Sequence, residues 1–129
     1  ISEEAFRKKL TSMGIELEKT SPEDDNKLCV DFFATINGIK VGFQVKPYSF
    51  FKSLRSRSRS SLEKIWNASY TYKNIIFFAY VNDDKVRFVV KKKGGGIKPV
   101  LPEDFVKIFE LTEDKVRTYY ISIFKEMYS

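Results

Sequence analysis

The stretch between residues 28 and 46 decides the fold. Its first part, 28–36, reads LCVDFFATI, its second part, 39–46, reads IKVGFQVK, and Asn37-Gly38 separates the two. Both turn residues tolerate positive φ, and two apolar runs around an Asn-Gly pair are the strongest short-range signal for a β-hairpin with a type I′ turn. The sequence therefore predicts two antiparallel strands joined by a two-residue turn.

A two-residue turn determines which residues face each other across the hairpin. If Ile36 lies opposite Ile39, then Asp31 lies opposite Gln44. Side chains alternate between the two faces of a strand, so Asp31, Gln44 and Lys46 share one face. The other face is a predicted core face, and it carries Val30, Phe32, Ala34, Val41, Phe43 and Val45.

The cluster of Asp31, Gln44 and Lys46 has two explanations. This face is either the solvated side of an antiparallel sheet, with Asp31 and Lys46 as an ordinary cross-strand ion pair, or a functional site. Polar groups among apolar residues are costly unless they are paired or used. Both explanations stay open at the level of the hairpin alone.

Composition narrows the function classes. The chain has 129 residues, 43% of them hydrophobic and 16% aromatic, so it is long enough for one domain with a real core. It begins at Ile1 without Met, and we expect a single domain over residues 1–129, excised from a longer protein. The formal net charge of +6 favours a polyanionic partner, DNA before an acidic membrane, although a basic protein without such a partner is the simpler reading.

The counts of histidine and cysteine exclude several chemistries. No His is present, which rules out His-based triads, His general bases and His metal ligands in this chain. One Cys forms no intramolecular disulfide and no Cys-rich zinc site, and it suits a reducing cytoplasm. No apolar run reaches the ~18 residues of a membrane span. Hydrolytic chemistry would need carboxylates, lysines and a hard cation such as Mg²⁺.

The rest of the chain is predicted from its periodicity and from its turn residues. Residues 21–27 read as a solvated polar loop. Helices are predicted over 2–14, over most of 49–72, and from 102 and 112 onward, and strands over 15–20, 74–81 and 85–91. The link between the second hairpin strand and the strand at 74–81 is a predicted parallel crossover. These elements predict an α/β (α+β) fold, a mixed sheet of about five strands with the hairpin at its centre and helices on both sides.

Other residues are candidates for binding. Glu3 lies beside the apolar stripe of the first helix and points toward its packing partner, or it only compensates the helix dipole. Basic residues that could contact phosphates form an Arg-Ser run and a Lys-Gly tip, and both could equally be exposed loops: Arg55, Arg57, Arg59, Lys91, Lys92 and Lys93. Tyr70 and Tyr72 could stack on nucleic-acid bases, but they continue a helical stripe and are predicted to pack in the core.

Several of these motifs together resemble a known family. Val30-Asp31-Phe32, the Asn37-Gly38 gap and then Phe43-Gln44-Val45-Lys46 resemble the PD-(D/E)XK nuclease superfamily, which has the restriction-endonuclease-like three-layer αβα fold. Gln44-Val45-Lys46 is similar to the Gln-x-Lys variant of Mrr-type and MjaI-type restriction endonucleases. Glu3, followed by an apolar helix that ends at Gly14, resembles the first helix of that group. The resemblance covers residues 2–81.

The resemblance implies a metal-dependent DNA endonuclease of the restriction type. Mg²⁺ would be held by Asp31, by the Gln44 side-chain oxygen, by the Val45 carbonyl and by Glu3. Lys46 would orient the attacking water. The sequence departs from the pattern because no Pro precedes Asp31 and because an amide, Gln44, replaces the middle acid, which leaves open whether catalysis is retained.

The sequence leaves three alternative functions for the chain. The first is DNA phosphodiester hydrolysis, with a homodimer expected because cutting both strands of a duplex needs two sites. The second is a DNA-binding module with a degenerate nuclease fold. The third is a protein-interaction domain that uses the aromatic terminal helices.

Overall fold

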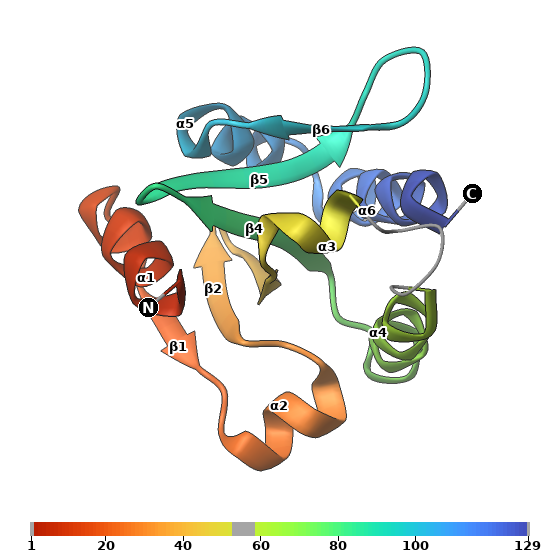
Figure 1. Ribbon diagram of the computed structural model, residues 1–129, viewed down its shortest axis with the longest axis horizontal. Helices are drawn as coiled ribbons and strands as arrows, with labels where there is room; N and C mark the ends of the chain where they lie inside the picture. Colours follow the sequence, from red (N-terminus) through yellow and green to blue (C-terminus); the bar gives the residue numbers. More distant parts are fainter. Residues whose placement is uncertain (1, 53–58, 129) are drawn as a thin grey trace.

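The computed structural model describes residues 2–52 and 59–128. Its centre is one mixed sheet in the order β1-β2-β3-β4-β5-β6, flanked by helices (Figure 1). The strands are β1 (Leu17–Lys19), β2 (Phe32–Ile36), β3 (Ile39–Val45), β4 (Ile76–Asn82), β5 (Lys85–Lys91) and β6 (Ile97–Val100). The predicted mixed α/β fold with a central hairpin is therefore confirmed.

The central hairpin has the predicted register. Ile36 pairs with Ile39 and Phe32 with Phe43. Asn37 and Gly38 both have positive φ, 52° and 81°, which matches the two-residue turn that their side chains favour. The Asn37 side chain also donates to the Phe109 carbonyl over 2.7 Å, and this bond ties the turn to the C-terminal third of the chain.

The start of the hairpin differs from the prediction. Residues expected to form a polar loop are instead the helix α2 (Pro22–Leu28), which begins with a Ser21 cap that accepts from the Asp24 N–H over 3.1 Å. A Ser cap followed by Pro and three acids is a helix start signal, and the loop prediction undervalued it. The helix ends at Cys29 with φ 57°, and the chain bends at Asp31, so β2 begins only at Phe32.

The bend also moves Val30 away from its predicted face. A Cβ atom added at Gly42 would lie 2.9 Å from a Val30 methyl group. Gly42 and Gln44 share one face of β3, opposite to Phe43. Val30 therefore packs on the face of Gln44, because strict alternation does not continue through the bend.

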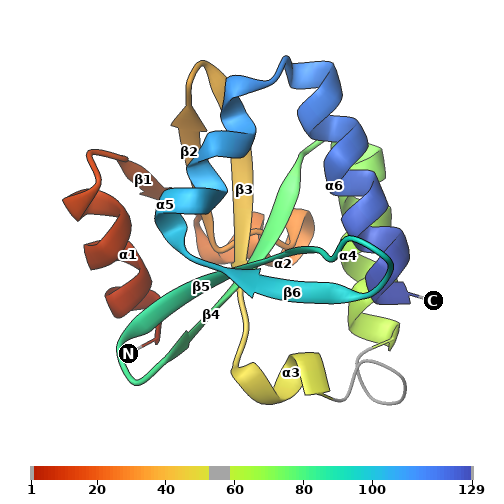
Figure 2. The same ribbon diagram turned by 90° about the horizontal axis from the view of Figure 1, so that it is seen from above.

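The connection from β3 to β4 is the predicted parallel crossover. Gln44 pairs with Phe78 in parallel register, and the Lys46 N–H donates to the Ala79 carbonyl over 2.9 Å. The chain between the two strands forms α3 (Tyr48–Lys52) and α4 (Arg59–Tyr72), and Figure 2 shows both helices from above. Tyr70 is 78% exposed and Tyr72 is 39% exposed, so the predicted core packing of both side chains is wrong.

The sheet has six strands rather than about five. The missed strand, β6, pairs antiparallel with β5 around the Lys92–Gly96 turn. It is short and contains Pro99, which cannot donate to a ladder and is tolerated on an edge. These features concealed the strand from a reading based on apolar alternation.

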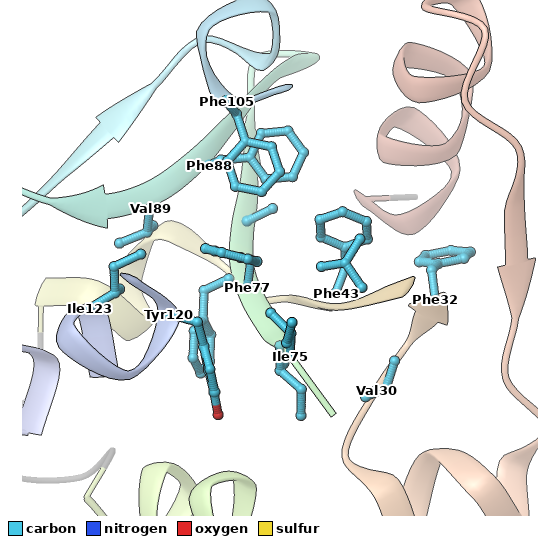
Figure 3. Close-up of a cluster of buried hydrophobic side chains, with 14 of the residues drawn as sticks. Val30, Phe32, Phe43, Ile75, Phe77, Phe88, Val89, Phe105, Tyr120 and Ile123 are labelled. Atoms are coloured by element: carbon cyan, nitrogen blue, oxygen red, sulfur yellow. The ribbon is translucent and has the colours of Figure 1, made fainter. Parts of the chain in front are cut away.

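Helices cover both faces of the sheet. On one face, α1 (Ser2–Ser12) and α5 (Pro102–Phe105) pack aromatic rings onto β3 and β5, and Figure 3 shows Phe88 beside Phe105, with their ring centroids 4.0 Å apart and nearly parallel. On the other face, α3 places Phe50 and Phe51 over Phe78.

The C-terminal part of the chain closes the fold. A 3₁₀ turn (Val106–Glu110) follows α5, and α6 (Glu113–Tyr128) packs beside α4, where Trp66 contacts Phe124. Among residues 2–52 and 59–128, no helix has the length and apolar character to cross a bilayer.

Candidate active site

A pocket of about 440 Å³ opens at the carboxyl end of β3. It lies between α2, the start of the hairpin and the first two turns of α4. Its lining brings together residues that are far apart in the sequence: Pro22, Asp25, Asn26, Cys29, Asp31, Gln44, Lys46, Ser61, Lys64 and Ile65. The predicted trio of Asp31, Gln44 and Lys46 therefore converges in one cavity.

The bend between α2 and β2 positions Asp31. Its N–H donates to the Phe43 carbonyl over 2.8 Å, and its carboxylate oxygen Oδ2 accepts from the Val45 N–H, also over 2.8 Å. Only 9% of Asp31 is exposed. Strand β3 thus holds the Asp31 backbone and one oxygen of its nearly buried carboxylate in place at the wall of the pocket.

The surroundings raise the pKa of Asp31 from its ordinary 3.8 to about 6. Burial is the main cause, because it removes water from the charged form. The Val45 N–H and the Lys46 ammonium lower the pKa, whereas the nearby carboxylates of Asp25 and Glu3 raise it. At neutral pH Asp31 is mostly ionised, but at a cost that a cation or another positive group in the pocket would offset.

Gln44 is buried to 94%, with 6% of its surface exposed. Its side-chain nitrogen donates to the carbonyl of Cys29, the residue whose left-handed conformation ends α2. This hydrogen bond uses the donor end of the amide, so the oxygen Oε1 is the atom that Gln44 offers to a ligand. A Glu at this position would lose the bond to Cys29.

Lys46 does not form the ordinary ion pair with Asp31. The ion pairs among the described residues join Lys8 to Glu4, Lys9 to Glu103, Lys19 to Glu3 and Lys107 to Asp104. The half-buried Lys46 instead places its ammonium 5.3 Å from the centre of the Phe50 ring. The hairpin face is therefore a pocket wall with a charge of each sign rather than a solvated cross-strand pair.

Glu3 and Val45 lie outside the pocket lining, as far as residues 2–52 and 59–128 define it. Glu3 points toward the sheet, as the helical stripe predicts, but its carboxylate pairs with Lys19 on β1. It acts on Asp31 only through its charge. Val45 contributes its N–H to Asp31, and its predicted role as a carbonyl ligand stays a prediction.

Two charged residues of the pocket lining, Asp25 and Lys64, are not predicted from the sequence. Asp25 lies on α2, where the sequence predicts a loop, and Lys64 lies on α4, where the sequence pattern indicates only an apolar stripe. The helix start at Ser21-Pro22 could have indicated Asp25. No local signal marks Lys64, because only the packing of α4 against α2 brings it to the pocket.

Among the predicted DNA contacts, only the lysines of the β5–β6 hairpin belong to the part of the chain that the structure describes with side chains. Arg55 and Arg57 lie outside the described residues, as does the side chain of Arg59, the first residue of α4. Lys91, Lys92 and Lys93 are exposed at the β5–β6 hairpin. Figure 1 shows this hairpin far from α2, at the other end of the molecule, so these lysines do not line the pocket.

The oxygen atoms of the pocket are of the type that binds a hard cation, but few of them are available as ligands. Mg²⁺ prefers oxygen ligands, keeps several waters and needs only one or two carboxylates. Asp31, Asp25 and the Gln44 oxygen provide such atoms around one cavity. Within the described residues, no group of three or more Asp, Glu, His or Cys side chains could hold a metal. Any Mg²⁺ here would thus depend on the Gln44 amide and on water.

Comparisons with known proteins give no family: no protein-family model matches the chain, and no curated protein does. The pocket is therefore the feature of this chain that indicates a function.

Proposed function

We propose that this chain is a metal-dependent DNA endonuclease domain of the PD-(D/E)XK kind, in the Gln-x-Lys variant and of the restriction type. The observation that carries the proposal is the convergence of Asp31, Gln44 and Lys46 in one pocket at the end of β3. The element order agrees with it: a helix, a strand, the hairpin, a helical crossover and a parallel strand. The net charge of +6 suits a polyanionic substrate.

The residues of the pocket take distinct roles in this proposal. A bound Mg²⁺ would lower the pKa of a water molecule and offset the charge that develops on the phosphate. Asp31 and the Gln44 oxygen would hold the cation. Lys46 would orient the attacking water and stabilise the added negative charge. Glu3 is the weakest of the proposed ligands, because its carboxylate is paired with Lys19.

The proposal includes an oligomeric state and a cellular location for the protein. Double-strand cleavage by one site per chain calls for a homodimer. A cytoplasmic location suits the free thiol of Cys29, the single cysteine.

Cleavage of supercoiled plasmid DNA tests the function. The chain is incubated with plasmid in Mg²⁺ or in EDTA, beside Asp31→Asn and Lys46→Ala. Matched controls are Asp83→Asn and Lys85→Ala, which lie on the exposed β4–β5 turn. Nicking or cutting is expected only with Mg²⁺, and it should fall at least 100-fold in both site variants and stay unchanged in both controls.

Gln44 favours a second candidate. Its amide brings no charge to the site, so a nuclease fold that only binds DNA is the alternative. Salt-sensitive DNA binding without Mg²⁺-dependent cleavage would select that alternative. If the chain neither binds nor cuts DNA while all variants fold normally, the nuclease proposal is wrong and the interaction-domain reading gains weight.

A further inference from the structure

Two helices with opposite charge face each other across the pocket. The first turn of α2 holds three acids, Glu23, Asp24 and Asp25, and Asp25 reaches the pocket lining. The first turn of α4 holds no acid, and α4 contributes Ser61 and Lys64 to the lining. Because α2 and α4 pack against each other, the pocket has an acidic rim at Asp25 of α2 and a basic rim at Lys64 of α4.

The basic rim offers an unpaired ammonium group. Lys64 is exposed, and neither Lys64 nor Lys46 belongs to the ion pairs formed among residues 2–52 and 59–128. These two lysines come from different elements, α4 and the end of β3, and border the same cavity. Asp25 and Asp31 line the same cavity, but neither ammonium group is held in an ion pair, so both can attract an anion to the space between them.

The direction of α4 adds to this attraction. Ser61 is the third residue of a 14-residue helix. The N-terminal turn of a helix carries a partial positive charge and N–H groups that lack helical partners. The pocket therefore meets the positive end of α4, next to a hydroxyl that can donate to a phosphate oxygen.

We propose that Lys64 and Ser61 position a DNA phosphate at the α4 rim, opposite Lys46, and that the acidic α2 rim directs the DNA backbone toward α4. This inference rests on the proposed nuclease function and deepens it. It assigns the phosphate contact to residues at the pocket, in place of the Lys91–Lys93 hairpin, which lies far from it. Lys64 is a positioning residue here.

Binding of a fluorescently labelled DNA duplex, followed by anisotropy in EDTA over a range of NaCl concentrations, tests this assignment. Lys64→Ala should weaken binding about 3- to 10-fold at low salt and reduce the slope of log affinity against log salt by about 1, as expected for one lost phosphate contact. Lys64→Arg should keep both values, because the charge remains. Lys85→Ala is the matched control on a distant exposed lysine and should change neither.

A substitution in the acidic rim should change the DNA affinity in the opposite direction. Asp25→Asn removes one negative charge from the entrance and should strengthen DNA binding in EDTA about twofold or more at low salt. A purely structural role would not produce opposite changes at the two rims. Thermal unfolding of each variant checks that Lys64→Ala, on an exposed side chain, leaves the melting temperature unchanged.

The outcomes separate this inference from the nuclease proposal. If wild type cuts plasmid but Lys64→Ala binds DNA like Lys85→Ala, the phosphate assignment is overturned and the nuclease stands. If Lys91→Ala weakens DNA binding and Lys64→Ala does not, the phosphate contact belongs to the β5–β6 hairpin. The assignment to Lys64 is then overturned as well. If wild type neither binds nor cuts DNA, both proposals fail together.

Discussion

The two faces of the hairpin β2–β3 are built from alternate residues of the same strands, yet they differ in chemistry. One face carries Phe32 and Phe43 into an aromatic cluster closed by Phe6 of α1 and by Phe105 of α5. The other carries Gln44, next to the buried carboxylate of Asp31. The first face is apolar and closely packed, whereas the second buries polar groups around an open pocket.

This difference indicates that the aromatic face stabilises the fold and that the polar face serves function. Buried rings stabilise a fold through the apolar area they remove from water. A buried carboxylate opposes folding unless a hydrogen bond or a cation compensates it. We therefore expect substitutions on the aromatic face to lower stability, and substitutions on the polar face to change stability in either direction while abolishing function.

The largest effect is expected on the aromatic face. Phe43 is fully buried and contacts three other rings, so Phe43→Ala should lower the free energy of unfolding by about 3–5 kcal/mol. Urea denaturation measures it. The matched control is Phe51→Ala, a half-buried residue of α3, which should cost less than half as much. Equal losses at the two positions would mean that the core is not concentrated on the α1 and α5 face.

The second prediction tests whether Gln44 only stabilises the fold through its hydrogen bond or also contributes to a metal site. Gln44→Glu replaces the donor that meets the Cys29 carbonyl with an acceptor and adds a second carboxylate beside Asp31. At pH 8 without metal it should cost about 2–4 kcal/mol. Millimolar Mg²⁺ should restore much of this loss, and Mg²⁺ should not affect the control Gln44→Met. Loss of stability without any response to Mg²⁺ would contradict the metal site.

The smallest of the three changes has the opposite sign. The pKa of Asp31 is about 6 in the folded protein against 3.8 ordinarily, so the folded state binds protons more tightly than the unfolded state. The stability that Asp31 contributes is present below pH 4 and is lost as the pH rises through 6. At pH 8 Asp31→Asn should be more stable than wild type by about 2–3 kcal/mol.

The comparison of the two proteins across pH measures this effect. The difference between wild type and Asp31→Asn should shrink toward pH 4, where both side chains are neutral. The substituted amide can still accept the Val45 N–H. A variant that is less stable than wild type at pH 8 would show that the ionised carboxylate supports the fold.

The hairpin could be predicted from residues close together in the chain. A two-residue Asn-Gly turn determines the register, and the register places Asp31 opposite Gln44. The parallel crossover follows from the chain length between β3 and β4. Errors arose where two signals competed: the acids after Ser21 suggested a loop although they began a helix, and Pro99 concealed an edge strand.

Short-range patterning thus specifies the strands, the turn and the trio of Asp31, Gln44 and Lys46, because alternation and turn geometry act over a few residues. It does not specify the partners that arrive from elsewhere. Whether Glu3 meets the pocket or Lys19, and whether Asp25 and Lys64 border the cavity, depends on how α1, α2 and α4 pack. Helix packing follows apolar stripes, and the polar residues beside a stripe are carried to positions that only the assembled fold defines.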